Sequence, residues 1–74
     1  MQSRHKYKVG DLVYAEFREQ IFTPKIVSGI GLIIELLFEG LISTYRPIYL
    51  VYMQETGEHW EFTEEEISLL EEKL

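Results

Sequence analysis

Apolar residues lie along short segments of the chain that turn signals separate. Residues 12–18 combine β-branched and aromatic side chains, as strands do, and the Gly10-Asp11 pair before them predicts a turn. Residues 48–53, "IYLVYM", have the composition of a second such strand. The residues Glu-Thr-Gly-Glu at 55–58 then predict a hairpin into a further strand, with Gly57 in the position that tolerates positive φ.

Residues 30–39 fit two periodicities. All even positions are apolar and the odd positions are half polar, which predicts a strand with Ile30, Leu32 and Ile34 pointing inward and Gly31 giving room for a bend. A helix would also place apolar residues on one stripe, opposite Glu35. The flanking glycines and the isoleucines favour the strand.

The connections are less clear than the strands. Residues 19–28 are predicted as a loop because Pro24 lacks an amide hydrogen, and residues 40–47 are predicted as a second loop. Both contain large apolar residues, among them Ile21-Phe22 and Leu41-Ile42, so they either cover the core or meet a partner.

Thr63 and Glu66 have the spacing of a capping box, which predicts a helical turn at that point. Beyond it two readings stay open. Ile67, Leu70 and Leu74 suit a helix, whereas Ile67 and Leu69 suit a short closing strand after a single 3-10 turn.

The length of 74 residues allows one domain, residues 1–74, with a polar leader at 1–6 and a tail at 71–74. The chain has no cysteine, and the N-terminus has no apolar stretch of the signal-peptide type, so we expect host cytoplasm or virion rather than secretion. Glu35 and Glu39 within the longest apolar stretch argue against a membrane span.

The order of these segments resembles small SH3-like β-barrels. The matching stretches are "KVGDLV", "GIGLIIE", "YLVYMQETGEHW" and "TEEEISLL". In such barrels a Gly-Asp turn precedes the first strand and a short 3-10 turn precedes the last. The chain is most similar to short uncharacterised proteins of tailed phages, particularly those that infect cyanobacteria, through residues 29–33 and 60–66. The resemblance implies an all-β barrel of about five strands with a short 3-10 or helical turn near the C-terminus, and a phage origin.

Catalytic motifs are poorly represented. A dinucleotide fingerprint would need a third glycine where Ile34 stands, and no P-loop lysine follows. His59 and Glu61 share one face of a predicted strand, opposite inward Trp60 and Phe62, but two ligands are too few for a metal site. We therefore expect no enzyme, no cofactor and no metal.

The charge is uneven along the chain. The net charge is −6: residues 1–25 carry five basic and three acidic residues (+2), whereas residues 26–74 carry two basic and ten acidic residues (−8). The acidic majority disfavours binding to nucleic acid. The alternative function is a nucleic-acid-associated barrel in which Arg4, Lys6 and Lys8 contact phosphates and Tyr7 stacks on a base.

Aromatic residues point to a protein partner, because a barrel this small cannot hold all its tyrosines and its tryptophan inside. The predicted function is a non-catalytic protein–protein interaction module, associated with the virion or binding a host protein, or binding a second copy of itself. The predicted partner-binding residues are Phe22, Tyr45, Tyr49, Trp60, Glu61 and Glu64.

Overall fold

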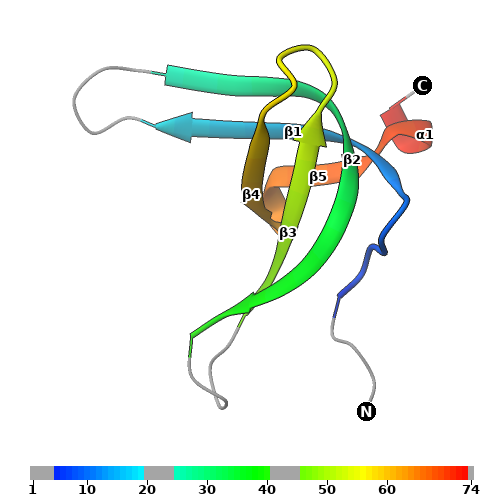
Figure 1. Cartoon of the computed structure of the whole chain (residues 1–74), viewed down its shortest axis with the longest axis vertical. Coiled ribbons are helices and arrows are strands. Elements are labelled where there is room, and N and C mark those ends of the chain that lie inside the picture. Colours follow the sequence, from blue (N-terminus) through cyan, green and yellow to red (C-terminus); the bar gives the residue numbers. More distant parts are fainter. Residues whose placement is uncertain (1–4, 20–24, 41–45, 74) are drawn as a thin grey trace.

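The computed structural model describes residues 5–19, 25–40 and 46–73, which form one antiparallel sheet of five strands (Figure 1). The elements in chain order are β1 (Leu12–Glu19), β2 (Lys25–Glu39), β3 (Arg46–Met53), β4 (His59–Thr63), the 3-10 turn η1 (Glu64–Glu66), β5 (Ile67–Leu69) and α1 (Leu70–Lys73). The strand order is β4-β3-β2-β1-β5, so the last strand returns to pair with the first. The predicted small all-β class of five strands with a 3-10 turn near the C-terminus is confirmed, and the sheet is loosely consistent with an SH3-like arrangement. Within the described residues, no ladder closes the sheet between β4 and β5.

The strand β2 organises the sheet. Its first half pairs with β1 and its second half with β3, and Figure 1 shows it curving around the other strands. The register with β3 shifts between Ile33 and Glu35, so Ile34 lies in a β-bulge. A bulge adds one residue to one strand and bends it. The bulge therefore contributes to the curvature that wraps this thin sheet around a core.

The inward direction predicted for Ile30, Leu32 and Ile34 is wrong. Gly31 and Ile33 face the core instead, whereas Ile30 and Ile34 are 39% and 37% exposed. The bulge explains the error, because an inserted residue reverses which alternate positions point inward. Only beyond the bulge does an even position, Leu36, pack against the core.

The core lies on the concave side of the sheet and contains no buried charged residue among the described positions. It comprises Tyr7, Val13, Ala15, Ile33, Tyr49, Val51, Met53, Phe62 and Ile67. Gly31 belongs to this side as well. A Cβ atom on Gly31 would lie 2.3 Å from Cγ1 of Val51 and 3.0 Å from the carbonyl oxygen of Tyr52. Glycine is therefore needed here for close packing of β2 against β3.

Two predicted loops are shorter than expected. β1 extends to Glu19 and β2 begins at Lys25, because residues of the supposed loop continue the ladder, as in the pair Phe17 and Val27. β3 likewise begins at Arg46 rather than after residue 47. The apolar segments Ile21-Phe22 and Leu41-Ile42 lie outside the described residues.

The two local turn predictions are confirmed. In the β3–β4 hairpin Gly57 has φ 74°, and the amide of Gly57 donates to the carbonyl of Met53 at 2.8 Å. The carboxylate of Glu66 accepts a hydrogen bond from the amide of Thr63 at 2.8 Å, as a capping box requires. Of the two readings left open for the C-terminus, the closing strand applies to Ile67–Leu69 and a single helical turn follows it.

Candidate protein-binding surface

The convex side of the sheet carries a row of apolar side chains across three strands. Leu12 pairs with Leu32, which in turn pairs with Tyr52. Their neighbours along the strands, such as Val13 and Val51, are buried, so these three side chains point away from the core. Leu12 is 44% and Tyr52 39% exposed, and Leu32 is half-buried.

Further apolar residues extend this row on both sides. Tyr14 pairs with Ile30 on one side, and Ile34 and Leu50 lie on the other. We define the outer face as Leu12, Tyr14, Ile30, Leu32, Ile34, Leu50 and Tyr52. The solvated side of an antiparallel sheet is ordinarily polar, whereas contiguous exposed apolar residues mark interaction surfaces. Burial of the core does not account for this face.

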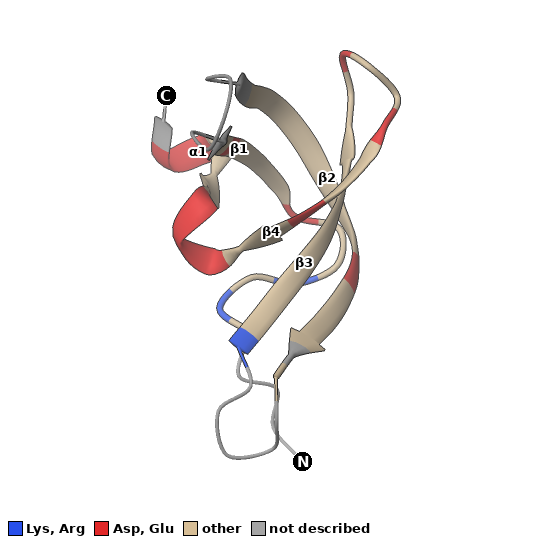
Figure 2. Cartoon of the chain, turned by 90° about the vertical axis from the view of Figure 1, so that its left-hand side faces the viewer, with Lys and Arg blue, Asp and Glu red and all other residues tan. Residues whose placement is uncertain are grey.

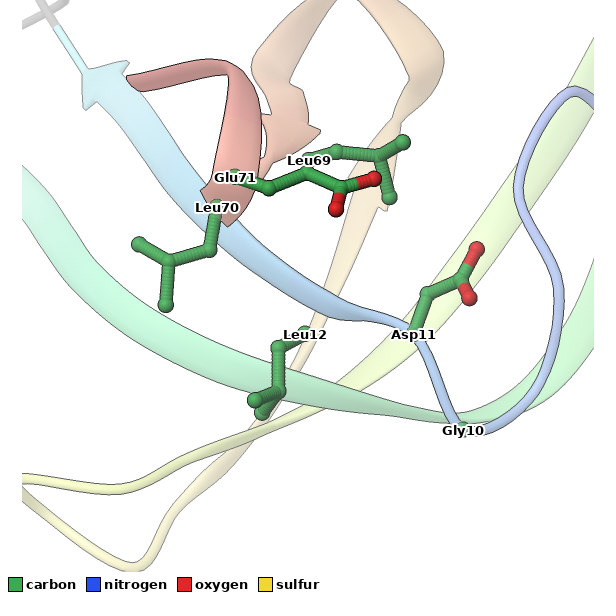
Figure 3. A pocket seen from close by; sticks show the side chains of 6 residues that line it. All are labelled: Gly10, Asp11, Leu12, Leu69, Leu70 and Glu71. Atoms are coloured by element: carbon green, nitrogen blue, oxygen red, sulfur yellow. The ribbon is translucent and has the colours of Figure 1, made fainter. Parts of the chain in front are cut away.

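Two hollows adjoin the outer face. The first, with a volume of about 420 Å³, is lined by Tyr14, Gly29, Ile30, Gln54 and Glu55. The second, of about 340 Å³, is lined by Leu12 of the outer face (Figure 3). Its other lining residues are Gly10, Asp11, Leu69, Leu70 and Glu71. Each hollow thus joins apolar side chains to at least one carboxylate.

Acidic residues lie at both ends of the outer face. Glu35 and Glu61 are exposed and stand on either side of Leu50, as its cross-strand partners. At the opposite end Glu55 lines the hollow beside Ile30. Figure 2 shows these acidic segments on β2, β4 and the β3–β4 hairpin. The basic residues whose side chains are described lie elsewhere along the chain, at positions 6 and 8 before β1 and at the first residue of β3.

The prediction that Tyr49 contacts a partner is wrong, because its side chain is fully buried. The Tyr49 hydroxyl donates a hydrogen bond of 2.5 Å to Oε2 of Glu64 and accepts one of 3.1 Å from the amide of Tyr7. Burial, followed by the hydrogen bond to the Glu64 carboxylate, raises the pKa of Tyr49 to about 12. The same Glu64 oxygen accepts the amide of Lys6 at 2.7 Å. Glu64, predicted for partner binding, here holds the N-terminal segment in place.

The prediction that Tyr7 stacks on a nucleic-acid base is wrong. Tyr7 is only 6% exposed, and its hydroxyl donates to the carbonyl oxygen of Ile67 at 3.4 Å, so its ring cannot stack on a base. Lys6 and Lys8 are exposed, with Nζ of Lys6 5.4 Å from the centre of the Tyr7 ring. Arg4 lies outside the described residues.

The remaining predicted residues do not form a single surface. Glu61 is exposed at the end of the outer face, but Trp60 is half-buried on the other side of β4. Trp60 borders another hollow of about 220 Å³, lined also by Val27, Met53 and Glu58, and Glu55 lines both this hollow and the one beside Ile30. Phe22 and Tyr45 lie outside the described residues.

His59 and Glu61 share the outward side of β4, as the alternation predicts, and the ring of His59 lies 5.6 Å from that of Tyr52. In residues 5–19, 25–40 and 46–73 no three or more His, Cys, Asp or Glu side chains lie close enough together to hold a metal ion.

The outer face itself was missed from the sequence. The signal was present, because Leu12 and Tyr14 alternate with Val13 and Ala15, so both sides of β1 are apolar. Reading the even residues of β2 as inward concealed the same property in that strand.

Comparison of the chain with protein-family models, with curated proteins and with solved structures finds no match. None of the helices in the described part of the chain is long and apolar enough to cross a membrane.

Proposed function

We propose that this chain is a non-catalytic protein-interaction module that binds another protein through the outer face. The observation that supports this is the cross-strand row of Leu12, Leu32 and Tyr52, with Ile30 and Ile34 beside it. Full burial of an isoleucine contributes about 1.5–3 kcal/mol, so burying the exposed part of Ile30 or Ile34, somewhat more than a third of each, contributes roughly 0.6–1.2 kcal/mol, and several such residues together supply a substantial part of a specific affinity. If the chain is phage-encoded, as its resemblance implies, the partner is a virion protein or a host protein.

The test is affinity capture by the tagged full chain from infected or expressing cells, with the captured proteins measured quantitatively. The double variant Ile30→Ser/Ile34→Ser removes two exposed apolar side chains without touching the core. Val9→Ser is the matched control, because Val9 is 56% exposed but precedes β1 and is not part of the outer face.

We expect the wild type and Val9→Ser to capture the same partner, and the double variant to capture about tenfold less of it, since the exposed parts of the two isoleucines together contribute roughly 1–2 kcal/mol. If the wild type, the double variant and Val9→Ser are all folded and capture equal amounts of the partner, the outer face is not the binding surface. Circular dichroism of each variant establishes that the fold is intact.

A further inference from the structure

The carboxylates at the two ends of the outer face indicate the charge of a complementary partner. We propose that the occupant is an extended apolar segment of another protein, flanked on both sides by Lys or Arg residues. This inference rests on the proposed function and specifies the chemistry of the partner.

The first step is the distribution of charge around the apolar centre. Glu35 and Glu61 are exposed and flank Leu50 at one end, and Glu55 is exposed beside Ile30 at the other. None of the described Lys or Arg side chains belongs to this face or to the hollow beside Ile30. The described charges at the two ends of the outer face are therefore all negative, and a partner complementary to them is positive at its two ends.

The second step is the distance between the two acidic ends. Ile30 and Glu35 are five residues apart on β2, but Ile34 is the inserted residue of the bulge, so the two ends are separated by about four strand positions, or about 14 Å at the rise of an antiparallel strand. An extended partner segment places basic residues this far apart when they stand about four positions apart in its sequence. Alternate side chains of that segment would face Leu12, Ile30 and Ile34.

A second copy of this chain fits less well. Two copies related by a two-fold axis would present the same patch to each other, so the acidic ends of one outer face would add to those of the other. Each copy also carries a net charge of −6. Such like-charge contacts oppose association most strongly at low salt, where a basic partner binds best.

The experiment uses the full chain and two synthetic peptides as probes. Both peptides have the same short centre of alternating Val and Thr, and one is flanked by lysines and the other by glutamates. Binding is measured by NMR titration, following the methyl groups of Leu12, Ile30 and Ile34. The charge variant is Glu35→Gln/Glu61→Gln, and its matched control is Glu65→Gln/Glu72→Gln, which removes the same charge from exposed residues of η1 and α1.

We expect the lysine peptide to bind at least about tenfold more tightly than the glutamate peptide, a difference of about 1.4 kcal/mol. This preference should fall to within about threefold in Glu35→Gln/Glu61→Gln and at high salt, because exposed charge pairs are weak and screened. It should persist in the control variant.

Equal binding of both peptides at the outer face would contradict the inference that the partner is flanked by Lys or Arg residues. It would leave the proposed protein-binding function standing. Shifts of the same methyl groups on raising the concentration of the protein alone, without binding of either peptide, would identify a second copy as the occupant instead. Absence of all three effects would contradict the proposed function itself.

Discussion

Replacing Gly31 with alanine tests the packing of β2 on β3 directly. The added methyl group would stand 2.3 Å from Cγ1 of Val51, more than about 1 Å inside the usual carbon–carbon separation. It would also meet the carbonyl oxygen of Tyr52 at 3.0 Å, and this oxygen belongs to the strand backbone. Neither neighbour can move aside freely, because Val51 is fully buried. Gly31→Ala therefore overpacks the core.

Overpacking a core by one methyl group costs about 1–3 kcal/mol, and a domain of this size loses about 4–8 °C of melting temperature per kcal/mol. We expect Gly31→Ala to lower the Tm by about 5–20 °C in a calorimetric or circular-dichroism melt. Val51→Ala alone should cost about 2 kcal/mol through the cavity it leaves. In the double variant the new methyl group enters that cavity, so the combined loss should be at least about 1 kcal/mol smaller than the sum of the two.

Gly10→Ala is the control. Gly10 has φ 97° and no atom within 4 Å of an added Cβ, so its substitution introduces backbone strain without a clash. Val51→Ala should therefore not rescue it. An unchanged Tm for Gly31→Ala, or strict additivity with Val51→Ala, would refute the claim that close packing requires glycine at this position.

Two further predictions concern hydrogen bonds. Because the pKa of Tyr49 is raised to about 12, the folded state keeps the phenol proton above pH 10, where the unfolded state loses it. The contribution of this proton to the free energy of unfolding should therefore be fully present below pH 10. It should fall by about 1.4 kcal/mol per pH unit between pH 10 and about 12. Tyr49→Phe should remove this pH dependence from the free energy of unfolding measured in urea titrations across that range. At neutral pH it should cost about 1–3 kcal/mol, because the Tyr7 amide and Glu64 lose their shared partner. A pH dependence identical to that of the wild type would contradict the role of the Tyr49 hydroxyl. Glu66→Ala should cost about 1 kcal/mol, since both the amide and the hydroxyl of Thr63 donate to Glu66, and an unchanged midpoint in the same titrations would argue against the cap.

The features that were predictable from the sequence are those fixed by neighbouring residues. The hairpin at Gly57 and the cap between Thr63 and Glu66 each depend on only a few consecutive positions. The composition of β1 and of β3 likewise identified them as strands. Local propensity and turn chemistry were sufficient for the all-β class.

The errors arose where contacts distant in sequence decide the structure. The bulge at Ile34 lies just beyond the end of the pairing between β1 and β2, within the pairing of β2 with β3, and no local signal marks the residue that is inserted. Tyr49 is buried because the leader crosses it, with the amide of Tyr7 separated from its hydroxyl by 42 positions along the chain. The predicted partner site was chosen by residue type, which does not tell a buried aromatic residue from an exposed one.

The same error shows how apolar residues that the fold requires can be distinguished from those that it does not. Ile33 and Ile34 are adjacent and identical in chemistry, yet the first is fully buried and the second is 37% exposed. The fold requires an apolar residue at the first position, where a polar side chain would lose its hydration. It makes no such demand at the second, nor at Ile30. The apolar residues on the two sides of β2 therefore need two different explanations. Packing of the core explains only those on the inner side. The proposed partner would account for the outer side.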